Sequence, residues 1–328
     1  MPIHRRRPRV IALGLIVPLA VTLVSLRPAG AQPTAGPFAV GVRDYTFVDK
    51  SRPTKAHNGQ PAQPTRTLPT RLWYPAKGAP GGPDVQNAKP DLAHGPYPLV
   101  VFSHGFGANG PAYGFFIRQW TEAGYVVAAP TFPLTHAGTP GGPDVSDYNQ
   151  QPADVSFVIT KLLKKNAKPT SAIHGVIDPN EIAASGHSLG AVTTLGVTYS
   201  NGCCRDLRIK AALPFAGIEL PFGDGSYQFP PVPMLYAHGT ADGTLNYSNG
   251  QKIYADASPP KWFVTLIGGG HTNIFLDKWG PVLNASAIDF MDFYLKGDAS
   301  GRDRLINDSQ VPGVASLQFQ ETAATRAA

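Results

Sequence analysis

Short apolar runs alternate with amphipathic stretches along most of the chain. Continuous apolar runs predict buried strands, and apolar residues that recur every three or four positions predict helices. The strands are expected at residues 99–102, 125–129, 181–184, 209–213, 234–237 and 262–267, and the helices at 112–123, 152–166, 189–199, 248–257 and 285–295. Strands separated by helices predict a mostly parallel sheet with helices on both faces.

The start of this pattern is different, because no helix separates its first two β-rich segments. These segments, residues 38–49 and 67–74, flank a polar stretch that contains prolines. They predict an antiparallel N-terminal edge of the sheet. Two long insertions, at 131–151 and 217–231, follow predicted strands at the edge where such sheets bind ligands.

The first 31 residues are typical of a secretory signal peptide. Arginines crowd positions 5–9, residues 10–26 are apolar, and small residues at 29–31 offer a cleavage site before Gln32. A glycine and a proline interrupt the apolar run, which favours cleavage over an uncleaved anchor. We therefore expect residues 32–328 to form a single catalytic domain, secreted or in the cell envelope, without stable membrane insertion after cleavage.

Export also explains the basic composition. Five of the 28 basic side chains lie before Gln32 and none of the 22 acidic ones does, so the remaining chain carries a net charge of +1. Such a balance gives no support to nucleic-acid binding. The absence of H-E-x-x-H and of a phosphate-loop motif likewise disfavours a zinc protease or a nucleotide-binding enzyme.

The two cysteines of the chain, Cys203 and Cys204, are neighbours. A bridge between neighbours closes almost no loop, so it cannot stabilise the fold through chain entropy. The sequence leaves three states open: a vicinal disulfide, two thiols or a bond to another chain.

A G-x-S-x-G pentapeptide, Gly186-His187-Ser188-Leu189-Gly190, joins a predicted strand to a predicted helix. This context is typical of a nucleophile elbow, where the chain turns so tightly that the serine hydroxyl stands exposed. Because glycine has no Cβ, the glycines at both ends of the pentapeptide permit a close approach of the incoming strand and the outgoing helix. Ser188 is therefore the candidate nucleophile, and the free amide of Leu189 at the helix N-terminus is a candidate oxyanion donor.

A serine nucleophile needs a base, and the base needs an acid that orients it. In the chain order expected of such a fold, both partners follow Ser188. His271 comes after a predicted strand and three glycines and is the predicted base, whereas His238 is interpreted as a polar residue that closes a strand end. Asp242 is the predicted acid, and Asp224 is the alternative.

The segment after an early central strand completes the predicted site. The backbone amide of Phe106 is expected to be the second oxyanion donor, with His104 organising the loop. Phe106, Phe132 and Trp279 are the predicted substrate-binding residues, with Leu134 beside them. Their apolar side chains favour an apolar acyl or aromatic group.

These motifs resemble those of secreted bacterial α/β-hydrolases related to dienelactone hydrolase, platelet-activating-factor acetylhydrolases and cutinase-like polyesterases. The resemblance spans residues 38–296. It is carried by Phe102-Ser103-His104-Gly105-Phe106, Gly186-His187-Ser188-Leu189-Gly190, His238-Gly239-Thr240-Ala241-Asp242 and Gly270-His271. It implies an α/β-hydrolase fold and a carboxylic-ester hydrolase that uses Ser188, Asp242 and His271 without a metal or cofactor.

The main hypothesis is thus a secreted serine esterase that acts on a small-molecule, lipid or polymer ester. An acyltransferase acting on cell-envelope alcohols shares the acyl-enzyme and is an alternative, as is a cutinase-like polyester hydrolase. A non-catalytic binding module on a hydrolase scaffold is a third reading.

Overall fold

The computed structural model describes residues 38–322, so the predicted signal peptide at 1–31 lies outside the described residues. The strands are β1 (Ala39–Asp49), β2 (Arg66–Ala76), β3 (Val85–Gln86), β4 (Tyr97–Ser103), β5 (Val126–Pro130), β6 (Ile177–His187), β7 (Ile209–Phe215), β8 (Met234–Gly239), β9 (Lys261–Leu266) and β10 (Ala315–Gln320). The α-helices are α1 (Gly114–Glu122), α2 (Gln151–Ala167), α3 (Leu189–Tyr199), α4 (Tyr247–Asp256), α5 (Trp279–Leu295) and α6 (Ala299–Asp308). Short 3₁₀ turns are η1 (Gly110–Tyr113), η2 (Val145–Gln150) and η3 (Asn273–Phe275).

The strands form one sheet in the order β10-β9-β8-β7-β6-β4-β5-β2-β1-β3. The central strands from β5 to β9 in this order pair in parallel, as predicted. β1 and β2 are antiparallel to each other, and β2 is antiparallel to β5, so the expected N-terminal edge is present.

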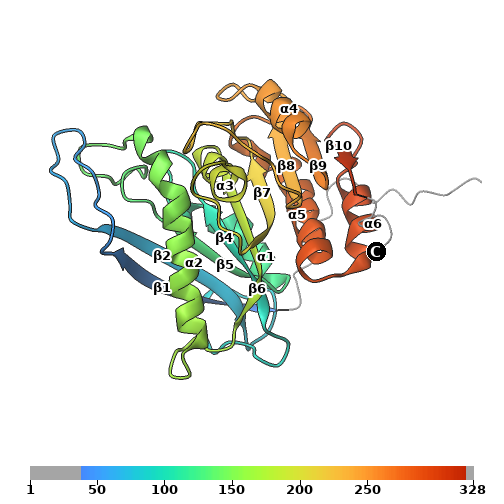
Figure 1. Cartoon of the computed structure of the whole chain (residues 1–328). Helices are drawn as coiled ribbons and strands as arrows, with labels where there is room; N and C mark the ends of the chain where they lie inside the picture. Colours follow the sequence, from blue (N-terminus) through green and yellow to red (C-terminus); the bar gives the residue numbers. More distant parts are fainter. Residues whose placement is uncertain (1–37, 323–328) are drawn as a thin grey trace, which may run out of the picture.

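Helices cover both faces of the sheet (Figure 1). Side chains of β4 alternate between the two cores: Val100 and Phe102 pack with α1 and α5, whereas Leu99 and Val101 pack with α2. α3 and α4 complete the second face through a cluster around Tyr199. Burial on both faces explains why the central strands read as continuous apolar runs.

The C-terminal part differs most from the sequence-based expectation. Helix α5 begins at Trp279 rather than at residue 285, because Pro281 lies in the first turn, where no intrahelical N–H partner is needed. Helix α6 and strand β10 were not predicted. β10 pairs antiparallel with β9 and stacks Phe319 on Trp262, with 4.5 Å between ring centroids.

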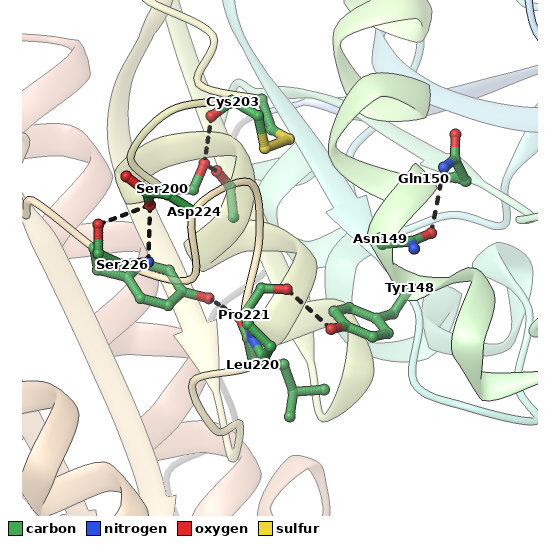
Figure 2. Close-up of a disulfide and its surroundings, with 12 residues drawn as sticks. Tyr148, Asn149, Gln150, Ser200, Cys203, Leu220, Pro221, Asp224 and Ser226 are labelled. Carbon is green, nitrogen blue, oxygen red and sulfur yellow. Dashed lines mark hydrogen bonds between the residues drawn. A yellow bond between two sulfur atoms is a disulfide. The ribbon is translucent and has the colours of Figure 1, made fainter.

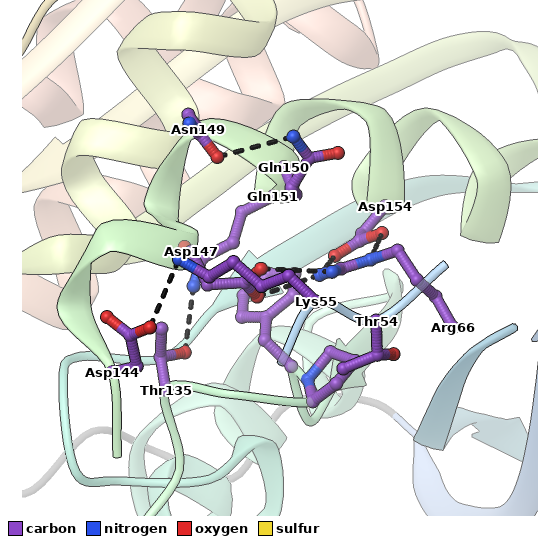
Figure 3. A network of polar contacts seen from close by, with 12 residues as sticks. Thr54, Lys55, Arg66, Thr135, Asp144, Asp147, Asn149, Gln150, Gln151 and Asp154 are labelled. Atoms are coloured by element: carbon purple, nitrogen blue, oxygen red, sulfur yellow. Dashed lines mark hydrogen bonds and ion pairs between the residues drawn. The ribbon is translucent and has the colours of Figure 1, made fainter. Parts of the chain in front are cut away.

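A buried network of ion pairs holds the first insertion, residues 131–151, against the sheet (Figure 3). The guanidinium of Arg66 on β2 bonds both carboxylate oxygens of Asp147 in η2, at 3.0 and 2.9 Å, and both oxygens of Asp154 in α2, at 2.9 and 2.6 Å. Arg52 adds a second cation to Asp154 at 2.7 Å. Such bidentate pairs fix geometry as well as charge, so they hold the end of this insertion in one place.

Candidate active site

The chain turns at Ser188 in a conformation that few side chains adopt. Ser188 joins β6 to α3 with φ 56° and ψ −118°. A Cβ added to Gly186 would lie 2.3 Å from the carbonyl oxygen of Gly190, and one added to Gly190 would lie 1.9 Å from that of Ser103. The two glycines thus let β6, α3 and the loop after β4 approach one another, which supports the strained turn.

The structure brings the three predicted catalytic side chains together. Nε2 of His271 lies 2.8 Å from Oγ of Ser188, and Nδ1 lies 2.7 Å from Oδ2 of Asp242. Oδ1 of Asp242 accepts from the amides of Thr244 and Leu245, each at 2.8 Å. Ser188, Asp242 and His271 follow β6, β8 and β9, which run in the same direction in one sheet, so three segments distant in sequence meet at one edge of the sheet.

The environment of Asp242 keeps the carboxylate ionised. Burial alone would raise its pKa, but the hydrogen bond from His271 and those from two backbone amides outweigh burial, so the pKa is lower than usual. An ionised acceptor holds the proton of the His271 ring on Nδ1. Nε2 is then unprotonated and can accept the proton of Ser188.

His238 has a role that its place at a strand end did not reveal. Its Nε2 lies 3.0 Å from Oδ2 of Asp242 and 3.0 Å from the carbonyl oxygen of Leu245. Because both partners only accept, Nε2 carries a proton and donates. Burial lowers the pKa of His238. A neutral second histidine therefore helps to fix the acid, while His271 contacts the serine.

The two predicted oxyanion donors are available. Within residues 38–322, no group accepts a hydrogen bond from the amide of Leu189 or of Phe106. The loop that carries Phe106 lies against the elbow, since a Cβ on Gly105 would be 3.4 Å from the carbonyl oxygen of His187. His104 organises this loop as expected. Its Nδ1 lies 2.8 Å from the carbonyl oxygen of Gly105, and its Nε2 accepts from the backbone amide of Phe132, in the loop after β5, at 3.1 Å.

The predicted substrate-binding residues have different surroundings. The side chain of Phe106 is 46% exposed and can meet a ligand. Phe132 is fully buried against the His104 ring, and Leu134 is also buried, so the expectation that Phe132 contacts substrate is wrong. Trp279 is half-buried, and its indole N–H donates at 2.9 Å to the carbonyl oxygen of Ile267, the residue before the three glycines.

Asp224, the alternative acid, does not face the elbow serine. It is exposed, and its carboxylate accepts from the amide and hydroxyl of Ser226 at 3.0 and 2.8 Å and from the side chain of Asn201 at 2.9 Å. These contacts are typical of an aspartate that caps a turn.

The adjacent cysteines form a disulfide, which decides among the three states left open (Figure 2). The hydroxyl of Ser200, just after α3, lies 2.7 Å from the carbonyl oxygen of Cys203. Cys203 and Cys204 pack in an apolar cluster with Leu189. The hydroxyl of Tyr148 donates to the carbonyl oxygen of Pro221 at 2.9 Å, so the two insertions meet beside this cluster.

Two buried histidines predict a loss of stability in acid. Burial lowers the pKa of His104 to about 4 and that of His187 to about 3. Below pH 6.5 the unfolded chain therefore binds protons that the folded protein does not, and the free energy of unfolding falls as pH falls.

We expect His104→Gln to remove one such contribution. Between pH 6 and 4.5 the free energy of unfolding of the wild type should fall by about 1 kcal/mol per pH unit more than that of the variant. Urea unfolding at several pH values measures both slopes. Parallel curves would show that His104 is not held neutral.

Two further observations bear on ligands. In residues 38–322, no group of three or more His, Cys, Asp and Glu side chains is arranged to hold a metal ion. Over the same range, every helix is too short or too polar to span a bilayer.

Comparisons with families and with curated proteins give only short matches. No family model matches the chain. The uncharacterized protein YfhR of Escherichia coli K12 is 33% identical over 61 residues, which cover 19% of this chain and 22% of that protein. YfhR of Salmonella typhi is 31% identical over 61 residues, covering 19% and 21%. The matches thus span about a fifth of the curated relatives' length.

A solved structure matches over more of the chain. The ferulic acid esterase from Streptomyces cinnamoneus superposes with a TM-score of 0.59 at 20% identity and covers 82% of this chain and 93% of its own. The likeness, together with the mostly parallel sheet, confirms the predicted α/β-hydrolase fold.

Proposed function

We propose that this protein is a carboxylic-ester hydrolase that forms an acyl-enzyme on Ser188. The observation that carries the proposal is the continuous chain of contacts from Ser188 through His271 to Asp242, at 2.8 and 2.7 Å. The solved structure of similar fold is that of a ferulic acid esterase, which supports an ester as the substrate.

The first half of the reaction forms the acyl-enzyme. Oγ of Ser188 attacks the acyl carbonyl while Nε2 of His271 takes its proton, and Asp242 stabilises the imidazolium that results. The amides of Leu189 and Phe106 stabilise the oxyanion, each lowering the barrier by roughly 3 kcal/mol. His271 then gives its proton to the leaving alcohol.

The second half returns the enzyme to its starting state. Water loses a proton to His271 and attacks the acyl carbonyl, and the same amides stabilise the second oxyanion. As this intermediate collapses, the bond from the acyl carbon to Oγ breaks, His271 returns its proton to Oγ of Ser188, and the acid is released. The exposed ring of Phe106 beside the elbow supports an apolar or aromatic group on the substrate. Residues 1–31 support export of the enzyme.

Covalent labelling and an ester panel test the proposal. We expect a fluorophosphonate to modify wild-type protein at Ser188, as located by peptide mass spectrometry. A panel of p-nitrophenyl esters from acetate upward should show a preference for short to medium chains. Ser188→Ala should be neither labelled nor active. Labelling at another residue, or unchanged turnover in Ser188→Ala, would refute the role of this serine.

A further inference from the structure

His187, the residue before the elbow serine, lies between two parts of the site and touches both. Its Nε2 lies 2.7 Å from the main-chain carbonyl oxygen of His271. Its Nδ1 lies 2.8 Å from the hydroxyl of Tyr113, which also accepts from the amide of Gly105 at 3.3 Å. One line of hydrogen bonds therefore runs from the loop that carries Phe106 to the segment that carries the candidate base.

The partners allow a single arrangement of protons along this line. A carbonyl only accepts, so Nε2 of His187 carries the proton of the neutral ring and Nδ1 accepts. The hydroxyl of Tyr113 must then donate to Nδ1, which leaves its oxygen free to accept from Gly105. Burial keeps His187 neutral, with a pKa of about 3, and raises the pKa of Tyr113 to about 12, so neither group changes its proton near neutral pH.

Packing leaves these side chains little freedom. His187 is 2% and Tyr113 is 9% exposed. The His187 ring lies 4.7 Å from that of His271 and 4.9 Å from that of Phe275, between centroids, and the Tyr113 ring lies 5.7 Å from that of Phe275. The line of hydrogen bonds is thus enclosed by rings and shielded from water, where such bonds are stronger than in solvent.

The segment that carries His271 is rich in glycine, and the amides of these glycines donate to Thr240, Leu266 and Asn273. Three glycines precede His271, and glycine restricts the backbone less than any other residue. The bond from His187 fixes the main chain at His271 itself. The bond from Gly105 to Tyr113 fixes the neighbour of the Phe106 amide in the same way.

We propose that Tyr113 and His187 act as one positioning unit that sets the His271 imidazole and the Phe106 amide relative to Ser188. The inference rests on the proposed function, because it assigns these residues to the geometry of the same reaction. Neither residue touches the reacting atoms. Loss of either one should therefore misplace the catalytic groups while leaving substrate binding nearly unchanged, and a misplacement of about 1 Å can cost about 10²-fold in rate.

Three substitutions interrupt the line at different points. Tyr113→Phe keeps the ring but removes the hydroxyl. His187→Gln retains a donor for the His271 carbonyl and loses the acceptor for Tyr113, whereas His187→Asn retains the acceptor and loses the donor. Tyr199→Phe is the matched control, because Tyr199 is also buried, at 1% exposed, and donates its hydroxyl to the carbonyl oxygen of Val232 at 3.0 Å, at the far end of α3.

The measurements are kcat and KM on a p-nitrophenyl ester, normalised to active sites titrated with a fluorophosphonate. We expect Tyr113→Phe and both His187 variants to lower kcat by about ten- to a hundredfold with KM within about twofold, and Tyr199→Phe to match the wild type. The double variant Tyr113→Phe/His187→Gln should have a kcat no lower than that of the less active single variant, because the second substitution acts on a line of hydrogen bonds that is already interrupted.

Several outcomes would overturn the inference: a kcat of Tyr113→Phe within twofold of wild type, an effect on KM alone, or losses that multiply in the double variant. If Tyr113→Phe does not fold, the comparison of His187→Gln with His187→Asn still tests it, since two wild-type values would refute the positioning role. Failure of the proposed function is distinct, because wild-type protein would then release no acid or Ser188→Ala would stay active.

Discussion

Replacing Asp242 by asparagine is expected to lower kcat by about 10⁴-fold, although the two side chains have the same shape. One carboxylate oxygen accepts from two backbone amides at 2.8 Å, so the asparagine must place its own oxygen there. Its NH₂ then faces Nδ1 of His271, which the carboxylate now meets at 2.7 Å. Donation to Nδ1 moves the ring proton to Nε2, and that nitrogen can no longer take the proton of Ser188.

The matched control is Asp224→Asn, the same change at the alternative acid. It should keep kcat within about twofold of wild type, because Asp224 caps an exposed turn. Steady-state kinetics on one p-nitrophenyl ester, with thermal unfolding of both variants, makes the comparison. A large loss in Asp224→Asn, or more than a few per cent activity in Asp242→Asn, would contradict the assignment of the acid.

The central sheet was accessible from the sequence because burial on both faces leaves a simple pattern. The apolar run of β4 marks the strand directly, and helix α3 has the predicted bounds, 189–199. Helix α6 and strand β10 were missed because they lack such a simple apolar pattern. α6 is mostly polar, with Leu305 as its deeply buried side chain, and β10 buries only one end of a short edge strand. Such elements depend on the sheet they pack against.

The candidate site was predictable where chemistry and chain order sufficed. A serine between two glycines, then an aspartate and a histidine after later strands, identified the three side chains that the structure places in contact. Side-chain direction was not predictable in this way. Phe132 and Phe106 both follow strand ends, yet the first is buried and the second is exposed.

The contacts of the two histidines that support the site, His187 and His238, were likewise not predictable from the sequence. His187 precedes the serine and His238 precedes the aspartate, so both were visible in the motifs. The partners of His187 are a tyrosine 74 positions away and a main-chain carbonyl 84 positions away, and sequence spacing cannot specify such contacts. The partners of His238 are only four and seven positions away, but the direction of its ring still depends on the fold. Tyr113 itself lies in a 3₁₀ turn within a stretch predicted as ordinary helix, with nothing in its surroundings to mark a polar role.

Gly190→Ala is expected to reduce the free energy of unfolding by at least about 3 kcal/mol, above the usual cost of overpacking, because the obstacle is backbone. The new Cβ would lie 1.9 Å from the carbonyl oxygen of Ser103 and 2.9 Å from that of His104, and no side-chain rotation can relieve either contact. Gly243→Ala is the matched control, since a Cβ there meets no heavy atom within 4 Å. It should be neutral or stabilise by about 0.5 kcal/mol.

Urea unfolding of the two variants measures the predicted difference in their free energies of unfolding. The close approach at Gly190 holds the loop after β4 against the N-terminus of α3, and these two segments carry the amides of Phe106 and Leu189. Stability and the proposed oxyanion site thus depend on the same contact. If Gly190→Ala were as stable as Gly243→Ala, the loop could withdraw from the helix at little cost. The two amides would then not be held together by the fold, and the proposed stabilisation of the oxyanion would lose its structural basis.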